Sequence, residues 1–280
     1  MPIVDWRKHW TARRLRLGSG LVLFVYVCAH LVTHALGVWS LQLAESGLNL
    51  TKAVWQSWPG TAALYGAAAV HIALALRTVH ERRHWRLPPI EIVRLWAGFS
   101  LPLLLIGHAV NTRVGFALYG LQPSYGGVIA NLIASGSEGW QLALLAPGWL
   151  HGCLGLWLSL RRIAMFRRLR PLLICVTAAM PLLSAAGFVH MRGEVAANGA
   201  IRRAAVQAAA SADSLADWRY GLTGAYVVLL AGAFASGHLR NLMEIKRSAA
   251  RSLWISFRLD DRCDSEVEWR GRSDRDDTCQ

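Results

Sequence analysis

Cysteine is scarce in this sequence, and no two cysteines have the spacing of a metal site. The 280 residues contain only five. Three lie in apolar stretches and two in the polar C-terminal region: Cys28, Cys153, Cys175, Cys263 and Cys279. No Cys-x-x-Cys pair occurs, which excludes the usual cysteine-bound zinc and redox sites and a disulfide framework. We expect the cysteines to contribute to side-chain packing.

Charged residues are also few, and acidic residues are fewer than basic ones. Charged side chains make up 17% of the chain, hydrophobic ones make up 54%, and the mean hydropathy is +0.31. This composition is too apolar for an ordinary soluble domain. The net charge of +13 comes from basic residues that border apolar stretches. We therefore expect these residues to meet anionic lipid headgroups and not nucleic acid.

Six apolar stretches have the length that crosses a bilayer, about 20 residues each. They are Leu17–Val38, Thr61–Val79, Leu95–Phe116, Gln141–Leu160, Leu172–Met191 and Tyr220–Leu239. The sequence therefore predicts an all-α membrane protein with six transmembrane helices. The first stretch is too long for a cleavable signal peptide and has no cleavage site, so we expect it to be a retained span.

The basic residues gather at alternate ends of these spans. The clusters are Arg7–Arg16, Arg77–Arg94, Arg161–Arg170 and Arg240–Arg247. The connections around Glu45, Tyr125 and Glu138 are nearly free of lysine and arginine. Because loops rich in lysine and arginine stay in the cytoplasm, this pattern predicts that both termini are cytoplasmic.

One histidine lies inside each of the first four spans: His30, His71, His108 and His151. An imidazole in hydrocarbon is costly unless it has a partner, and imidazoles are the commonest axial ligands of haem iron. Two histidines can hold one haem, so four predict two haems. The alternative for each histidine is a hydrogen bond to a backbone carbonyl. His34, one turn beyond His30 on the same face, is a second candidate in the first span.

Depth and topology predict the same histidine pairs. At the helical rise, His30 and His108 lie about 21 Å from the cytoplasmic edge, whereas His71 and His151 lie about 15 Å from it. In an up-down-up-down bundle, spans one and three face each other diagonally, as do spans two and four. We therefore expect the first four spans to form a dihaem four-helix bundle that pairs His30 with His108 and His71 with His151.

The histidine segments resemble the dihaem cytochrome b anchors of fumarate reductase and succinate dehydrogenase. Ser19-Gly20 lies ten residues before His30, and Gly98 lies ten residues before His108. The other two matching segments are 71–77, which begins at His71, and 151–156, which begins at His151. The resemblance covers about residues 17–165. It implies that these four histidines are the axial ligands, with His30 favoured over His34.

Residues 166–240 extend beyond that resemblance. The chain is also similar to the six-span anchors of a bacterial class III adenylate cyclase family, in the segments 33–37, 64–66, 111–113, 124–125 and 149–153. In that family a ferredoxin module and a cyclase domain follow the anchor, and the haems report the redox state of the quinone pool. The similarity implies a multi-pass protein of the bacterial inner membrane.

The tail departs from that family. About forty residues follow Leu239, too few for either module, and the tail lacks the cysteine run of a ferredoxin. The expected organisation is a basic segment 1–16, a six-span dihaem domain 17–240 and a disordered polar tail 241–280. We expect a truncated or frame-shifted product, or an anchor whose output domain is a separate chain, with no catalytic site of its own.

Quinone is the expected electron partner, because it diffuses in the same apolar phase as the haems. Asn111, Arg113, Ser124 and Tyr125 lie near His108 and are candidates for a quinone groove. Alternatively, Arg113 reaches the headgroups and Tyr125 belongs to the interfacial aromatic belt. The guanidinium of Arg77 suits a haem propionate.

Two functions remain at this point. The first is a quinone-responsive redox-sensing input domain that acts on a cytoplasmic cyclase. The second is the cytochrome b membrane-anchor subunit of a succinate:quinone or fumarate reductase-type complex, with flavoprotein and iron–sulfur subunits as partners. A second copy of the chain is a further expected partner.

Overall fold

The computed structural model describes residues 6–120, 124–199 and 212–273, and within them helices account for nearly every residue and no β-strand occurs. Six helical segments are long and apolar enough to cross a membrane, and many of their large apolar side chains are exposed. The prediction of an all-α, multi-pass membrane protein is therefore confirmed.

The six membrane-crossing segments are formed by six long helices. They are α1 (Trp6–Leu36), α3 (Trp58–Glu81), α4 (Pro89–Ala109), α7 (Glu138–Leu160), α9 (Arg170–Ala197) and α11 (Ala212–Ser273). The third segment continues from α4 through a π-helical turn, η1 (Val110–Val114), and α5 (Gly115–Tyr119). Five of the predicted spans lie inside these segments, and the first ends two residues beyond α1.

Two shorter helices form a cap between spans. They are α2 (Leu41–Trp55) and α6 (Tyr125–Ser135), and each begins at a serine whose hydroxyl accepts from a backbone N–H of the first turn. Glu45 of α2 accepts from the N–H of Gly126 at 3.0 Å. The buried cluster beneath them includes Ala44, Tyr125, Ile129, Phe188, Met191 and Val195. Sequence reasoning treated both segments only as connections.

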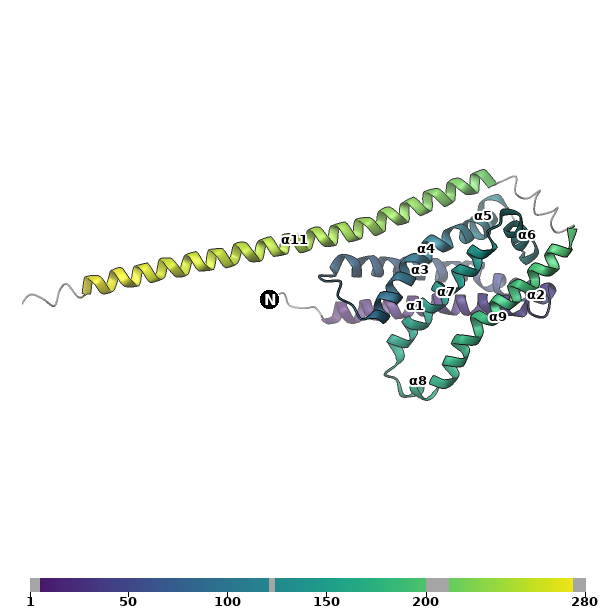
Figure 1. The fold of residues 1–280 in the computed structure, drawn as a ribbon, viewed down its shortest axis with the longest axis horizontal. Coiled ribbons are helices and arrows are strands. Elements are labelled where there is room, and N and C mark those ends of the chain that lie inside the picture. The colour runs from purple at the N-terminus through teal and green to yellow at the C-terminus, as the bar shows by residue number, and fades with distance from the viewer. Residues whose placement is uncertain (1–5, 121–123, 200–211, 274–280) are drawn as a thin grey trace, which may run out of the picture. The chain divides into compact units, whose positions relative to one another are not determined.

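The chain divides into two compact units, each described by itself. The first contains residues 1–76 and 86–230, and the second contains residues 77–85 and 231–280. In the first unit α4 packs closely against α7, and α1 packs against both α2 and α9 (Figure 1). Helix α3 contacts the other helices less extensively. In the second unit its end approaches α11 closely, because Gly237 lies against the backbone of His80.

The crossing of α1 and α9 is close because small residues lie on it. A methyl group added to Gly187 would collide with the carbonyl oxygen of His34. Ser184 donates a hydrogen bond to the carbonyl of Leu31 at 2.9 Å, and the Nδ1 of His190 lies 2.9 Å from the carbonyl of Gly37. The fifth span is thus fixed to the part of α1 that carries His30 and His34.

The C-terminal region differs from the expectation of a disordered tail after residue 240. Helix α11 crosses that boundary without a break and continues to Ser273. A charge-dense stretch without hydrophobic periodicity predicts disorder for 260–277, but charged residues do not by themselves end a helix. The sequence from 212 to 273 contains no proline, so nothing in it blocks the helical hydrogen bonds.

Candidate functional site

The fold brings the four histidines of the first four spans together as two pairs. The ring centroids of His30 on α1 and His108 on α4 are 5.8 Å apart. Those of His71 on α3 and His151 on α7 are 6.1 Å apart. These are the two pairs that depth and topology predict.

The separations fit two imidazoles on opposite faces of one metal. A metal–imidazole bond is about 2.0–2.1 Å, and a ring nitrogen lies about 1.1 Å from its centroid, so collinear ligands place two centroids about 6.3 Å apart. Within the described part of the chain, no three His, Cys, Asp or Glu side chains converge on a metal position. Two imidazoles can supply the two axial ligands of a metal that a macrocycle already holds.

Hydrogen bonds at Nδ1 orient the rings of His108 and His151. The Nδ1 of His108 lies 3.0 Å from Oε1 of Gln141, and that of His151 lies 3.0 Å from the carbonyl oxygen of Arg94. Because both partners are carbonyl oxygens, Nδ1 carries the proton and donates. The lone pair is then on Nε2, which is the tautomer that binds a metal.

The same tautomer follows for His71. Its Nδ1 lies 3.2 Å from Oγ of Ser19, and that hydroxyl also lies 3.2 Å from the carbonyl oxygen of Arg16. The hydroxyl has one proton, which it donates to the carbonyl, so it accepts from His71. Nε2 of His71 is again left with its lone pair.

His30 differs, because its Nε2 has a neighbour on the same helix, His34. The two Nε2 atoms are 3.3 Å apart, and the ring centroids are 4.7 Å apart. The Nδ1 of His34 is buried without a hydrogen-bond partner among the described residues. His30 faces His108, whereas His34 packs against the ring of Tyr125 at 5.0 Å. This placement favours His30 as the member of the pair.

We call His71 and His151 the inner pair and His30 and His108 the outer pair, after their expected depths. Two glycines leave room for the inner pair. A methyl group on Gly20 would lie 3.3 Å from Cε1 of His71, and one on Gly98 would lie 2.6 Å from Cε1 of His151. Gly20 and His30 share α1, and Gly98 and His108 share α4. The ten-residue spacing therefore places one glycine beside the inner pair and one histidine in the outer pair on each helix.

Tyr125 lies in the buried interior and not in an interfacial belt. Only 5% of it is exposed, and its hydroxyl is 2.6 Å from Oγ1 of Thr33. Thr33 donates to the carbonyl of His30 at 2.7 Å, so the tyrosine must donate to Thr33. Burial raises the pKa of Tyr125, which keeps the hydroxyl protonated. The chain of hydrogen bonds ends on the backbone of His30.

The residues expected to form a quinone groove each have other surroundings. Arg113 donates to Oγ1 of Thr61 at 2.8 Å and lies over the ring of Tyr65. Ser124 caps α6, and Asn111 is exposed. The structure does not bring these side chains together with Tyr125 in either of the two cavities described below.

Arg77 also has a partner other than the one expected. Its Nε lies 2.8 Å from Oε1 of Glu81, one turn further along α3, and both side chains are about half exposed. An exposed ion pair of this kind contributes little to stability. It leaves the guanidinium accessible, although directed along α3 towards Glu81.

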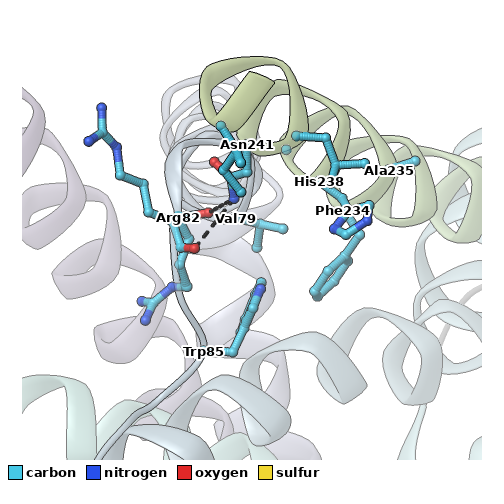
Figure 2. Close-up of a pocket in the computed structure, with 11 residues that line it drawn as sticks. Val79, Arg82, Trp85, Phe234, Ala235, His238 and Asn241 are labelled. Carbon is cyan, nitrogen blue, oxygen red and sulfur yellow. Dashed lines mark hydrogen bonds between the residues drawn. The ribbon is translucent and has the colours of Figure 1, made fainter. Parts of the chain in front are cut away.

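In the second unit, the end of α3 and the segment after it pack against α11. Nδ1 of His80 lies 2.9 Å from Oγ of Ser236, and the amide of Asn241 donates to the carbonyl of Arg82 at 3.0 Å. Figure 2 shows the hydrogen bonds of Asn241, with Trp85 and Phe234 nearby. These residues line a cavity of about 500 Å³, and the ring centroids of Trp85 and Phe234 are 5.0 Å apart. We call this contact region the α3–α11 joint.

Several residues of the site were missed by sequence reasoning. Ser19 and Gln141 orient histidines, and Thr33 links Tyr125 to His30. A polar side chain within an apolar span needs a hydrogen-bond partner, so the sequence indicates that each of the three has one. The sequence does not show which helix faces it.

No protein-family model, no curated protein and no solved structure matches the chain. The geometry of the two histidine pairs and the motif resemblance are therefore the features that bear on function.

Proposed function

We propose that this chain is a dihaem cytochrome b-type membrane protein that serves as a quinone-responsive redox input domain. His30 and His108 would hold one haem b, and His71 and His151 would hold the other. The observation that carries the proposal is the pairing of four intramembrane histidines at 5.8 and 6.1 Å. A bound haem would supply one-electron chemistry, while the chain positions it and sets its potential.

The hydrogen bonds at Nδ1 support this assignment over a merely structural role. A neutral histidine in the membrane needs one hydrogen-bond acceptor for its ring N–H, and His71, His108 and His151 have one each. In each of these three histidines the nitrogen left without a proton is Nε2, which is the nitrogen that binds a metal. The ring of each lies 5.8 or 6.1 Å from the ring of a histidine on another span.

The sensing role is supported by contacts of the last two spans. Helix α9 donates from Ser184 to the backbone of α1 beside His30, and α11 donates from Tyr226 to the carbonyl of Phe99, next to Gly98. The α3–α11 joint holds the same helix at the end of α3. A charge change at either histidine pair would thus act on a helix that α9 or α11 holds directly.

The proposal includes the expected location and partners. The chain would lie in the inner membrane of a bacterium with both termini in the cytoplasm, as its basic loops predict. Quinol would be the electron donor, and a cytoplasmic cyclase domain on a separate chain would be the output. The respiratory anchor is the second candidate, because the histidine pairs serve it equally well.

A haem assay on the full-length protein tests the proposal directly. Protein extracted from membranes of haem-supplied cells should give two b-type haems per chain in a pyridine haemochrome assay. Both irons should be low-spin, because two nitrogen ligands fill the axial positions. A preparation that folds but contains no haem would overturn the proposal.

A distance measurement separates the two functions. Spin labels at positions 84 and 245 of a cysteine-free variant would bracket the α3–α11 joint. In the sensor the interlabel distance should change when the haems are reduced, and a variant without haem should show no change. An unchanged distance, with full haem reduction, would favour the respiratory anchor.

A further inference from the structure

The turn between the fourth and fifth spans bears an open hollow lined almost entirely by arginines. It has a volume of about 500 Å³, and its lining residues are Trp157, Arg161, Arg162, Arg167 and Arg170. The short helix α8 (Ala164–Arg168) lies in this turn, between α7 and α9 (Figure 1). We call this feature the arginine hollow.

The turn that forms the arginine hollow has no carboxylate of its own. Residues 157–172 contain no aspartate or glutamate. Among the described residues, none of the four arginines belongs to an ion pair, whereas Arg77, Arg83, Arg192 and Arg240 each do. Four like charges around one cavity repel each other, and an anion within it would relieve that repulsion.

Aromatic rings hold part of the arginine hollow in place. The guanidinium of Arg170 lies 5.5 Å from the ring centroid of Trp157, and that ring lies 5.7 Å from the ring of Phe166. A guanidinium over a tryptophan face is favourable and restricts the side chain. The restricted side chain then loses less entropy when it binds an anion.

Exposed apolar side chains surround the same turn. Ile163 is 50% exposed, Met165 63% and Leu172 58%. A free phosphate ion would make no use of this apolar surface, whereas the acyl chains of a lipid would cover it. The combination of an unpaired basic cavity with an apolar rim at the end of two spans fits a lipid better than a soluble anion.

We propose that the arginine hollow binds the phosphate headgroup of an anionic phospholipid. The planar fork of each guanidinium matches two phosphate oxygens, and several guanidinium groups can neutralise a headgroup with two phosphates. The acyl chains lie along the exposed side chains of the turn. This site is separate from the histidine pairs, and it does not depend on the proposed haem chemistry.

The test uses the full chain in detergent with native mass spectrometry. Delipidated protein is titrated with cardiolipin, phosphatidylglycerol, phosphatidylcholine or inorganic phosphate. We expect cardiolipin to bind tightest and phosphatidylcholine weakest. The double variant Arg162→Gln/Arg167→Gln should weaken cardiolipin binding about tenfold or more, because two charge-assisted contacts are lost. The variant Arg162→Lys/Arg167→Lys keeps the charge but loses the planar fork of the guanidinium. Its affinity for cardiolipin should lie between those of the unaltered chain and the glutamine variant.

A matched control removes the same charge elsewhere. Lys246→Gln/Arg247→Gln should bind cardiolipin as the unaltered chain does. Equal weakening in the control would show a general charge effect and overturn the site, as would unchanged binding in the glutamine variant. Displacement of the lipid by millimolar inorganic phosphate would overturn the lipid as ligand. If the glutamine variant does not fold, the lysine variant decides, and unchanged affinity in it overturns the site.

Discussion

The ring of His151 lies so close to Gly98 that a methyl group there would come within 2.6 Å of its Cε1 atom. Real side-chain carbons do not approach this closely, so Gly98→Ala must displace the imidazole. We expect this variant to lose most of the inner haem and to keep the outer one. Gly20→Ala, whose methyl would lie 3.3 Å from His71, should lose less. Haem per chain by pyridine haemochrome measures both.

Gly66→Ala is the matched control for these variants. It lies on α3, five residues before His71, and its methyl would meet nothing within 4 Å. Alanine also favours the helix, so stability should not fall. Equal haem content in all three variants would contradict the role that we give to the two glycines.

If each pair holds one haem, replacing either histidine of a pair should remove the same haem. His30→Ala and His108→Ala should each remove the outer haem, and their combination should remove no more, because one absent axial ligand already weakens the site. His71→Ala and His151→Ala should behave in the same way for the inner haem. His34→Ala should keep both haems. Loss of haem in His34→Ala, with retention in His30→Ala, would reverse the assignment within α1.

Gln141 should tune the outer haem through His108. Gln141→Leu removes the acceptor for Nδ1, and the loss of such an orienting contact costs about 10–100-fold in metal affinity. Gln141→Glu supplies a stronger acceptor, makes the imidazole a better donor to the oxidised iron and should lower the midpoint potential of that haem. A redox titration that follows each haem separately measures the shift. A shift confined to the inner haem would contradict the pairing.

The histidine pairing could be predicted from sequence because it depends on coarse features. One histidine per span, four spans and an up-and-down order leave the diagonal arrangement as the natural one. The distance between the pairs was predicted less well. Depths of about 21 and 15 Å imply that the two pairs are about 6 Å apart. In the structure Gly20 lies beside His71 and so marks the level of the inner pair on α1. His30 of the outer pair is ten residues further along the helix, or about 15 Å away.

The error arose from the assumed edge of the membrane. The depth of His30 is counted from Arg16 and that of His71 from Glu81, as if both residues marked the same edge. A guanidinium nitrogen of Arg16, however, donates to the carbonyl of Leu74, seven residues before Glu81. Long basic side chains bend towards the interface, so their backbone positions do not mark its depth. Contacts such as those of Ser19 and Gln141 depend on the rotation of each helix, which a nearly uniform apolar surface does not encode.

Thr33 and Tyr125 should be energetically coupled. Tyr125→Phe removes a donor and should lower the free energy of unfolding by about 0.5–1.5 kcal/mol. Thr33→Val leaves the buried tyrosine hydroxyl without its acceptor and should cost more, about 1–3 kcal/mol. In the double variant the two effects should not add, because both remove the same hydrogen bond. Thermal unfolding in detergent measures the cycle, and strict additivity would contradict the contact.

Reduction by quinol should depend on Arg113 more than on Tyr125. Arg113 is half-buried and has a hydroxyl partner, Thr61, that a quinone carbonyl oxygen could replace. The hydroxyl of Tyr125 is buried and already donates to Thr33. In proteoliposomes, Arg113→Gln should therefore slow haem reduction by a quinol analogue about tenfold without loss of haem, and Tyr125→Phe should slow it less. Arg77→Gln loses only an exposed ion pair, so quinol should reduce the haems of this variant at the unaltered rate. If Arg77→Gln is slowed and Arg113→Gln is not, the quinone site lies at the opposite end of the spans.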